Sequence, residues 1–139
     1  MLVEHPRSVV IVAVADGTIV VVEQHRPGSN GPTVELPAGC MEEGEDGLAC
    51  AKRELAEECS LGAARWHSLG SFWAAPAYST EYVAVFEACE LFTSRGVPDP
   101  DEELTAGTLP LSELPGALSD ATSLAAFALW IAQVRDGAS

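Results

Sequence analysis

Hydrophobic and polar residues alternate in short blocks over the first forty positions of the chain. Val9–Val14 and Thr18–Glu23 are rich in valine and isoleucine, and Asp16-Gly17 separates them. Because Asp-Gly favours the tight two-residue turn between antiparallel strands, this pattern predicts a β-hairpin. A Gly/Ser/Asn/Pro segment at 28–32 predicts a loop, and Thr33–Leu36 predicts a short strand after it.

A helical period begins after this strand. From about Asp46, apolar residues recur at steps of three and four, which predicts a helix with one buried face formed by Leu48, Ala51, Leu55 and Cys59. Asp46 is suited to cap the start of this helix. A second helix is predicted over Asp120–Val134, capped near Ser119 or Asp120 and ended by Gly137.

The rest of the chain predicts further strands joined by polar loops. Strands are expected at Trp66–Trp73, Glu81–Leu91 and Leu104–Leu109, with a short turn or helix at Ser112–Leu118. Strands and helices mix without strict alternation, so we expect an α/β fold with a mixed sheet and helices on its faces. The length of 139 residues and the hydrophobic content of 47% predict one domain, 1–139, with a substantial core.

The chain is strongly acidic, with 7 basic and 21 acidic residues and a net charge of −14. This charge argues against binding to nucleic acid or to an anionic membrane surface. The longest apolar run, Val9–Ala15, is too short to span a bilayer, and the first residues lack the pattern of a signal peptide. The four cysteines fit no zinc motif, and we expect them to be small buried residues in a reducing cytosol. A cytoplasmic location is therefore expected.

Three carboxylates fall on one face of the first predicted helix. Glu54, Glu57 and Glu58 stand at i, i+3 and i+4, where like charges repel by roughly 0.2–0.5 kcal/mol per pair. Mg²⁺ and Mn²⁺ prefer such oxygen ligands, often together with substrate phosphates. Arg53 lies beside the cluster and is placed to orient a carboxylate. The alternative is an acidic face that only contacts water.

The wider spacing resembles the Nudix box, G-x5-E-x7-R-E-U-x-E-E-x-G-U, where U is a bulky aliphatic residue. The matching positions are Gly39, Glu45, Arg53, Glu54, Leu55, Glu57, Glu58 and Leu61. Ser60 replaces the last glycine, and it fits a left-handed helix end less well, so nearby Gly62 is an alternative site for the turn. The resemblance implies a Nudix fold, an α/β/α sandwich. It also implies two or more Mg²⁺ or Mn²⁺ ions held by Glu54, Glu57, Glu58 and the backbone carbonyl of Ala38, with Arg53 in the catalytic set.

Flanking segments are similar to the bacterial ADP-ribose pyrophosphatase branch of that family. They are Gln24-His-Arg26, Glu35-Leu-Pro37-Ala38-Gly39 and Ala75-Pro76-Ala-Tyr78-Ser79-Thr-Glu81. This resemblance implies metal-dependent hydrolysis of ADP-ribose or a related nucleotide sugar to AMP and a sugar phosphate. Gln24, Arg26, Glu35 and Glu81 are then the expected substrate-binding residues. Ala77 departs from the glycine that the branch commonly has.

Many members of the branch carry an additional N-terminal sheet that builds a dimer. The first core strand is expected here at about Val9, so we expect this chain to lack that sheet, and a homodimer is left open. The base that activates water comes, in several members, from a separate acidic loop. Its counterpart here is 99–103, where Glu102 is the first candidate and Glu103 the second.

Two other functions remain open at this point. One is a Nudix hydrolase of nucleoside triphosphates or dinucleotides, and the other is a non-catalytic module that binds a nucleotide sugar. Trp73 and Tyr78 are placed either to stack on a base or to fill the core, and the core is favoured. The expected partner is a small nucleotide-sugar molecule, without nucleic acid or membrane.

Overall fold

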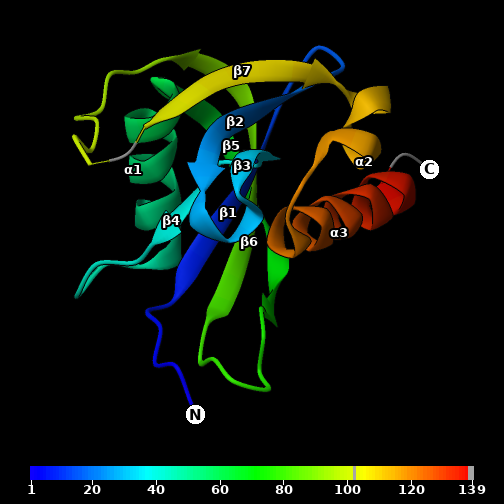
Figure 1. The fold of residues 1–139 in the computed structure, drawn as a ribbon. Helices are drawn as coiled ribbons and strands as arrows, with labels where there is room; N and C mark the ends of the chain where they lie inside the picture. The colour runs from blue at the N-terminus through cyan, green and yellow to red at the C-terminus, as the bar shows by residue number, and fades with distance from the viewer. Residues whose placement is uncertain (102, 138–139) are drawn as a thin grey trace.

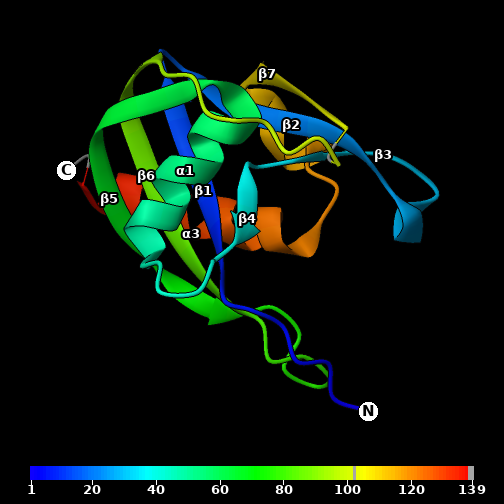
Figure 2. The ribbon, with the colours of Figure 1, turned by 90° about the vertical axis from the view of Figure 1, so that its left-hand side faces the viewer.

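A mixed β-sheet lies between two helical layers (Figures 1 and 2). The computed structural model describes residues 1–101 and 103–137. Within these residues the strand order is β3-β2-β1-β6-β5, with β4 paired to β1 and β7 paired to β2. β1 and β6 run parallel, and the other pairs are antiparallel. The strands are β1 (Ser8–Ala15), β2 (Thr18–Arg26), β3 (Gly31–Glu35), β4 (Ala38–Cys40), β5 (Leu61–Trp73), β6 (Tyr82–Thr93) and β7 (Leu104–Pro110).

Two α-helices form the outer layers, and shorter helical elements lie between β2 and β3 and between β7 and α3. α1 (Gly47–Cys59) covers one face of the sheet, and α3 (Ala121–Gly137) covers the other face (Figure 2). The short elements are η1 (Pro27–Ser29), η2 (Leu111–Glu113) and α2 (Leu114–Ala117). None of the described helices is both long and apolar enough to cross a membrane.

The hairpin predicted from Asp16-Gly17 is confirmed. Asp16 has φ 47° and Gly17 has φ 78°, so both turn residues take positive φ, as a type I′ hairpin turn requires. β1 pairs with β2 from this turn, with Val14 opposite Ile19. The first two strands predicted from the sequence are therefore present and paired.

β1 is the centre of the core because both of its faces are covered. Val9, Ile11 and Ala13 pack in the cluster beneath α1, and Val10 and Val12 pack in the cluster beneath α3. Successive side chains of a strand point to opposite faces, so a continuous apolar run satisfies both layers at once. The predicted α/β/α arrangement is confirmed.

The ends of α1 are set by Asp46 and Ser60. The Asp46 side chain accepts a hydrogen bond from the backbone N–H of Ala49 at 2.8 Å, as its predicted capping role requires. Ser60 takes the left-handed conformation itself, at φ 55° and ψ 39°, and its N–H donates to the Ala56 carbonyl at 3.0 Å. The alternative turn at Gly62 is wrong, because Gly62 lies within β5.

The buried face of α1 differs from the predicted one. Its buried residues are Cys50, Ala51, Glu54 and Leu55, whereas Leu48 is 37% exposed. At 100° per residue, Leu48 lies about a quarter turn from the centre of this buried face. The helix is rotated so that Glu54, one of the three predicted metal ligands, faces the protein.

α3 is tied at its start to the strand that leads into the acidic segment. Asp120 accepts a hydrogen bond from the Ser123 N–H at 3.2 Å, which confirms a cap at this residue. The Ser123 hydroxyl accepts from the Leu36 N–H at 2.9 Å, and the Ser119 hydroxyl accepts from the Val34 N–H at 3.0 Å. These bonds fix β3 and the following segment against the helix.

Candidate active site

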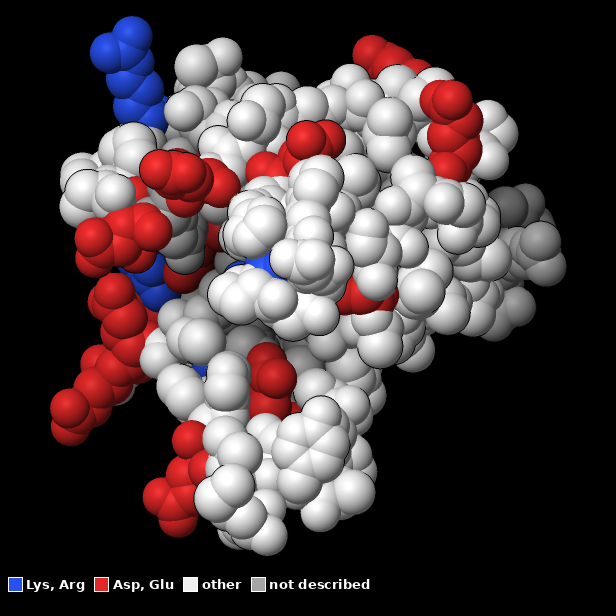
Figure 3. Space-filling view, viewed as in Figure 1, with Lys and Arg blue, Asp and Glu red and all other residues white. Residues whose placement is uncertain are grey.

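A cavity of about 660 Å³ opens between α1, β4, the N-terminal segment and the loop before β7. Figure 3 shows acidic side chains gathered on the left of one face, over α1 and the segment before it, beside a hollow. The residues that line the cavity are His5, Ser8, Val9, Val10, Gln24, Arg26, Ala38, Gly39, Cys40, Glu42, Arg53, Glu54, Glu57, Glu58, Glu81, Val97, Pro98, Asp99, Pro100 and Thr122. The fold thus brings most of the predicted site residues to one cavity.

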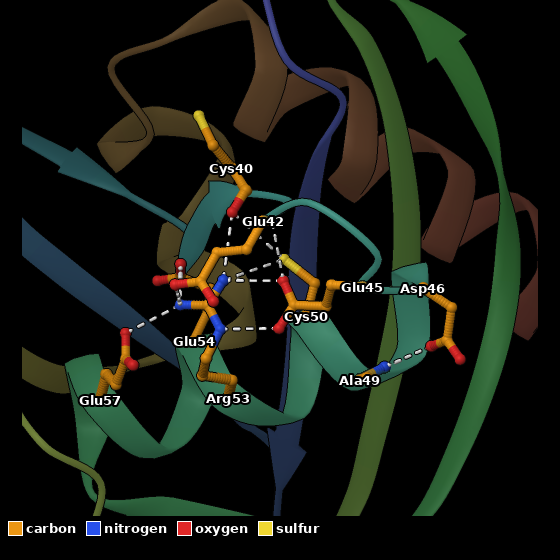
Figure 4. Close-up of polar contacts among 9 residues, drawn as sticks. All are labelled: Cys40, Glu42, Glu45, Asp46, Ala49, Cys50, Arg53, Glu54 and Glu57. Atoms are coloured by element: carbon orange, nitrogen blue, oxygen red, sulfur yellow. Dashed lines mark hydrogen bonds and ion pairs between the residues drawn. The ribbon is translucent and has the colours of Figure 1, made fainter.

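Arg53 is the centre of a charge network on the wall of this cavity (Figure 4). Its guanidinium donates two hydrogen bonds to the Glu45 carboxylate, at 2.8 and 2.9 Å. It also donates to Glu54 at 2.9 Å and to Glu57 at 3.1 Å, and to the Cys40 carbonyl at 3.2 Å. A planar guanidinium can hold several acceptors in fixed directions, so Arg53 sets the orientation of two of the three predicted metal ligands.

These contacts shift the ionisation of both partners. The hydrogen bonds from Arg53 lower the pKa of Glu45 from 4.5 to about 2. The hydrogen bonds to Glu45, together with the negative charges of Glu54 and Glu57, raise the pKa of Arg53 well above its ordinary value. Glu45 is therefore ionised at every pH at which the protein is expected to work. Sequence reasoning matched Glu45 to the motif but did not include it in the site.

Two carboxylates of the cluster, Glu54 and Glu58, contact β4, the strand that precedes α1. Glu54 is buried against Gly39, where a Cβ would overlap its carboxyl group. Glu58 accepts a hydrogen bond from the Ala38 N–H at 3.1 Å. β4 and the acidic face of α1 are thus packed together, and a side chain at Gly39 would have to displace the Glu54 carboxylate.

The donor set of this cavity fits a hard divalent cation. Glu54, Glu57 and Glu58 offer carboxylate oxygens, and Ala38–Cys40 offers backbone groups in the same wall. Within residues 1–101 and 103–137, no three His, Cys, Asp or Glu side chains are already arranged as a metal site. Arg53 holds Glu54 and Glu57 in hydrogen bonds, so an ion that collects all three carboxylates would compete with Arg53 for their oxygens.

Arg26 and Glu35 form a second charge pair at another part of the cavity. Arg26 donates two hydrogen bonds to Glu35, each of 2.9 Å, and the Thr33 hydroxyl donates to the same carboxylate at 2.6 Å. Burial disfavours the Glu35 anion, but the bonds from Arg26 and Thr33 outweigh it and lower the pKa of Glu35. Arg26 and Gln24 line the cavity, whereas Glu35, also predicted to bind substrate, is buried and is not among the lining residues. Glu35 is therefore placed to hold Arg26.

The N-terminal side of the cavity carries Ser8, Glu81 and His5. The Ser8 hydroxyl donates to Glu81 at 2.6 Å, and His5 Nδ1 lies 3.8 Å from the same carboxylate. Glu81 was predicted from its motif. His5 and Ser8 were not, because a histidine and a serine without characteristic spacing carry no signal in the sequence. Ala77, in the loop before Glu81, avoids the left-handed φ that would require glycine.

The loop before β7 contributes Val97, Pro98, Asp99 and Pro100 to the cavity. Glu102, the first candidate for the base, lies outside the described residues. Glu103 is exposed and does not line the cavity. Among the loop acids that the structure describes, Asp99 is thus the one in the cavity wall, and its Oδ1 accepts a hydrogen bond from the Asp101 N–H at 2.9 Å.

Three side chains that were expected to be buried are exposed, namely Trp73, Tyr78 and Cys40. Trp73 and Tyr78, which were expected in the core, are 57% and 58% exposed. They lie at and beyond the end of β5, which projects past both helices (Figure 1). Cys40 is exposed, whereas Cys50 is buried as expected, and burial raises the pKa of the Cys50 thiol to about 12. None of the four cysteines forms a disulfide.

Comparison with known proteins shows the family of this chain. The sequence profile described as "NUDIX domain" matches residues 4–130. The chain belongs to the Nudix family. The resemblance noted in the box and its flanks is thereby confirmed for the family.

Curated relatives of this Nudix protein include two described as "ADP-ribose pyrophosphatase". The protein from Bacillus subtilis is 37% identical over 103 residues, which cover 73% of this chain and 56% of the relative. The protein from Mycobacterium tuberculosis is 38% identical over 117 residues, which cover 81% of this chain and 56% of the relative. The chain thus spans little more than half the length of these relatives.

Solved structures support the fold of the Nudix chain. A crystal structure described as an ADP compounds hydrolase superposes with a TM-score of 0.86 over 94% of this chain and 74% of that one. The two sequences are 23% identical, so this likeness concerns the fold alone. It agrees with the mixed sheet and the two helical layers.

Proposed function

We propose that this protein is a divalent-metal-dependent pyrophosphatase that splits ADP-ribose, or a related nucleotide sugar, into AMP and a sugar phosphate. One observation carries the proposal. A single cavity is lined both by the three carboxylates of α1 and by the Arg26 guanidinium. A diphosphate linkage needs positive charge on its oxygens and a fixed position, and this cavity offers the means for both.

Glu54, Glu57 and Glu58 are the proposed ligands of Mg²⁺ or Mn²⁺, with the Ala38 carbonyl as a further ligand. Bound ions would neutralise phosphate oxygens and lower the pKa of a coordinated water. The high negative charge of the cluster makes such ions necessary, because an anionic substrate is otherwise repelled by a chain of net charge −14. Glu102 and Glu103 stay as proposed bases for the attacking water.

Arg53 and Glu45 act on the site through orientation. Arg53 spans Glu45, Glu54 and Glu57 within 3.1 Å, so it keeps the carboxylates close together despite their repulsion. Glu45 in turn keeps the guanidinium from rotating away. We therefore assign these two residues to positioning, and the three α1 carboxylates to direct contact with the ions.

The substrate class is proposed from the second half of the cavity. Arg26 has its guanidinium fixed by Glu35 and partly exposed, which suits recognition of a phosphate oxygen. Gln24 and Glu81 offer hydrogen-bonding groups for ribose hydroxyls. The volume of about 660 Å³ is in the range of cavities that hold small ligands. The names of the two curated relatives support the choice of ADP-ribose.

A substrate panel tests the proposal. ADP-ribose, ATP, dGTP and a diadenosine compound are each incubated with the protein and Mg²⁺, Mn²⁺ or excess chelator. We expect kcat/KM for ADP-ribose to exceed that for ATP by about tenfold or more, since an unpaired polar group in the pocket costs roughly 1–3 kcal/mol. The expected products are AMP and ribose 5-phosphate.

The outcomes of the panel separate the alternatives. Preference for a triphosphate or a dinucleotide overturns the ADP-ribose assignment and leaves a Nudix hydrolase of another substrate. Binding of ADP-ribose without turnover under any metal condition points to a non-catalytic module. Full activity in excess chelator contradicts the proposed role of the carboxylate cluster.

A further inference from the structure

Residues 94–101, which we call the rim loop, pass over the C-terminal half of α1 (Figure 2). The loop begins where β6 ends, and the Ser94 N–H donates to the Ser60 carbonyl at 3.0 Å. It then contributes Val97, Pro98, Asp99 and Pro100 to the wall of the cavity that the α1 carboxylates line. The rim loop therefore runs from the C-terminal end of α1, the helix with the proposed metal ligands, to the wall of the cavity.

Gly96 is the point at which the rim loop touches α1 most closely. A Cβ built on Gly96 would lie 2.6 Å from the Ala56 carbonyl carbon, 2.6 Å from the Glu57 nitrogen and 2.9 Å from the Ala56 oxygen. All three atoms belong to the helix backbone, which cannot move aside as a flexible side chain can. The loop is seated on the helix only because residue 96 has no side chain.

We propose that Gly96 is a positioning residue of the reaction. By resting directly on the backbone of Ala56 and Glu57, it sets the distance between the rim loop and the carboxylates that α1 carries. This inference rests on the proposed function. Gly96 has no group that reacts or binds substrate, so its effect is transmitted through the loop that follows it.

The chain after Gly96 is stiff enough to transmit a displacement. Pro98 and Pro100 restrict the backbone on both sides of Asp99, and the Asp99 side chain closes a turn onto the Asp101 N–H. A methyl group on residue 96 needs ordinary contact distance from the helix backbone, so the rim loop must move away from α1 by about 1 Å. Misplacement of this size can reduce the rate of an enzyme about 10²-fold.

The test compares Gly96→Ala with Gly107→Ala. Gly107 lies in β7, and a Cβ there meets no atom within 4 Å, so the second variant controls for the substitution itself. For Gly96→Ala we expect kcat for ADP-ribose to fall about 10- to 100-fold with KM within about twofold of wild type. For Gly107→Ala we expect both constants to match wild type.

Trypsin cleavage gives a readout that does not depend on activity. Arg95 is exposed and precedes Gly96 directly, so cleavage there yields the fragments 1–95 and 96–139. A seated loop resists the local unfolding that the protease needs. We expect Gly96→Ala to be cut at Arg95 about fivefold or more faster than Gly107→Ala, with similar melting temperatures.

Ser94→Pro provides a second route to the same state, because it removes the N–H that holds the loop to Ser60, and its ring meets the Ser60 carbonyl and leaves the Ala56 and Glu57 backbone untouched. It should reproduce the fall in kcat and the faster cleavage, and it decides the matter if Gly96→Ala does not fold. Wild-type kcat and slow cleavage in folded Gly96→Ala would overturn the proposal, as would a change in KM alone. Failure of wild type on the whole substrate panel defeats the proposed function, and the cleavage rates then decide by themselves whether Gly96 seats the loop.

Discussion

Replacement of Glu45 by glutamine tests the charge network around Arg53. Glu45→Gln preserves the shape of the side chain but removes the anion that accepts two hydrogen bonds from the guanidinium. The difference between the ordinary pKa of 4.5 and the value of about 2 sets a ceiling of about 3 kcal/mol on the stabilisation. Both side chains of the pair are partly exposed, so solvent screens their attraction, and we expect a loss of about 1–2 kcal/mol at pH 7.

The dependence of this loss on pH follows from the direction of the shift. Because the pKa of Glu45 is lower in the folded protein, its stabilising contribution is complete above about pH 4.5. It declines as the pH falls toward about 2, where the wild-type carboxylate takes up a proton and comes to resemble glutamine. The difference in unfolding free energy between wild type and Glu45→Gln should therefore be constant from pH 5 to 7 and should shrink below that range.

Urea unfolding followed by tryptophan fluorescence measures this difference, and the chain has three tryptophans for the purpose. Glu113→Gln serves as the control, since it removes the same charge from an exposed residue of η2. The control should be neutral within about 0.5 kcal/mol. A Glu45→Gln protein as stable as the control at pH 7, or a difference that does not depend on pH, would refute the reasoning.

Three further variants probe other parts of the site. Ser60→Gly should raise the free energy of unfolding by about 0.5–1 kcal/mol in urea titrations, because it relieves the left-handed serine at φ 55°; unchanged or lower stability counts against that strain. Gly39→Ala should lower kcat by about 10²-fold because its methyl group displaces the Glu54 carboxylate, and turnover equal to that of Gly107→Ala would disprove this. Arg26→Ala should raise KM more than it lowers kcat if Arg26 only binds substrate, and steady-state kinetics showing the reverse would give Arg26 a role in the transition state.

Local signals in the sequence were sufficient for the elements that position the site. The Asp16-Gly17 turn, the Asp46 cap and the continuous apolar run of β1 are each visible within a few neighbouring residues, so the pattern predicts them. Ser60 illustrates the limit of this reasoning. The alternative of a turn at Gly62 did not take account of β5, which begins directly after Ser60 and includes Gly62.

Contacts between distant segments could not be read in the same way. The pairing of Arg26 with Glu35 depends on the register of β2 against β3, which a single sequence does not reveal. Leu48 was expected in the core because helical periodicity gives the apolar side of a helix, but its rotation is set by the sheet on which it packs. Trp73 is exposed because β5 extends past the helices, and the length of a strand relative to its cover has no local signal.

Titration of Mn²⁺ into the protein tests the central claim most directly, namely that the acidic face of α1 holds a divalent ion. Calorimetry would compare wild type with Glu57→Gln and Glu58→Gln, and Glu113→Gln would again control for the loss of one charge. We predict binding by wild type and by the control, at least about tenfold weaker binding by both site variants, and a fall of about 10²-fold or more in their kcat. Equal Mn²⁺ affinity and near-normal turnover in both site variants would contradict the account.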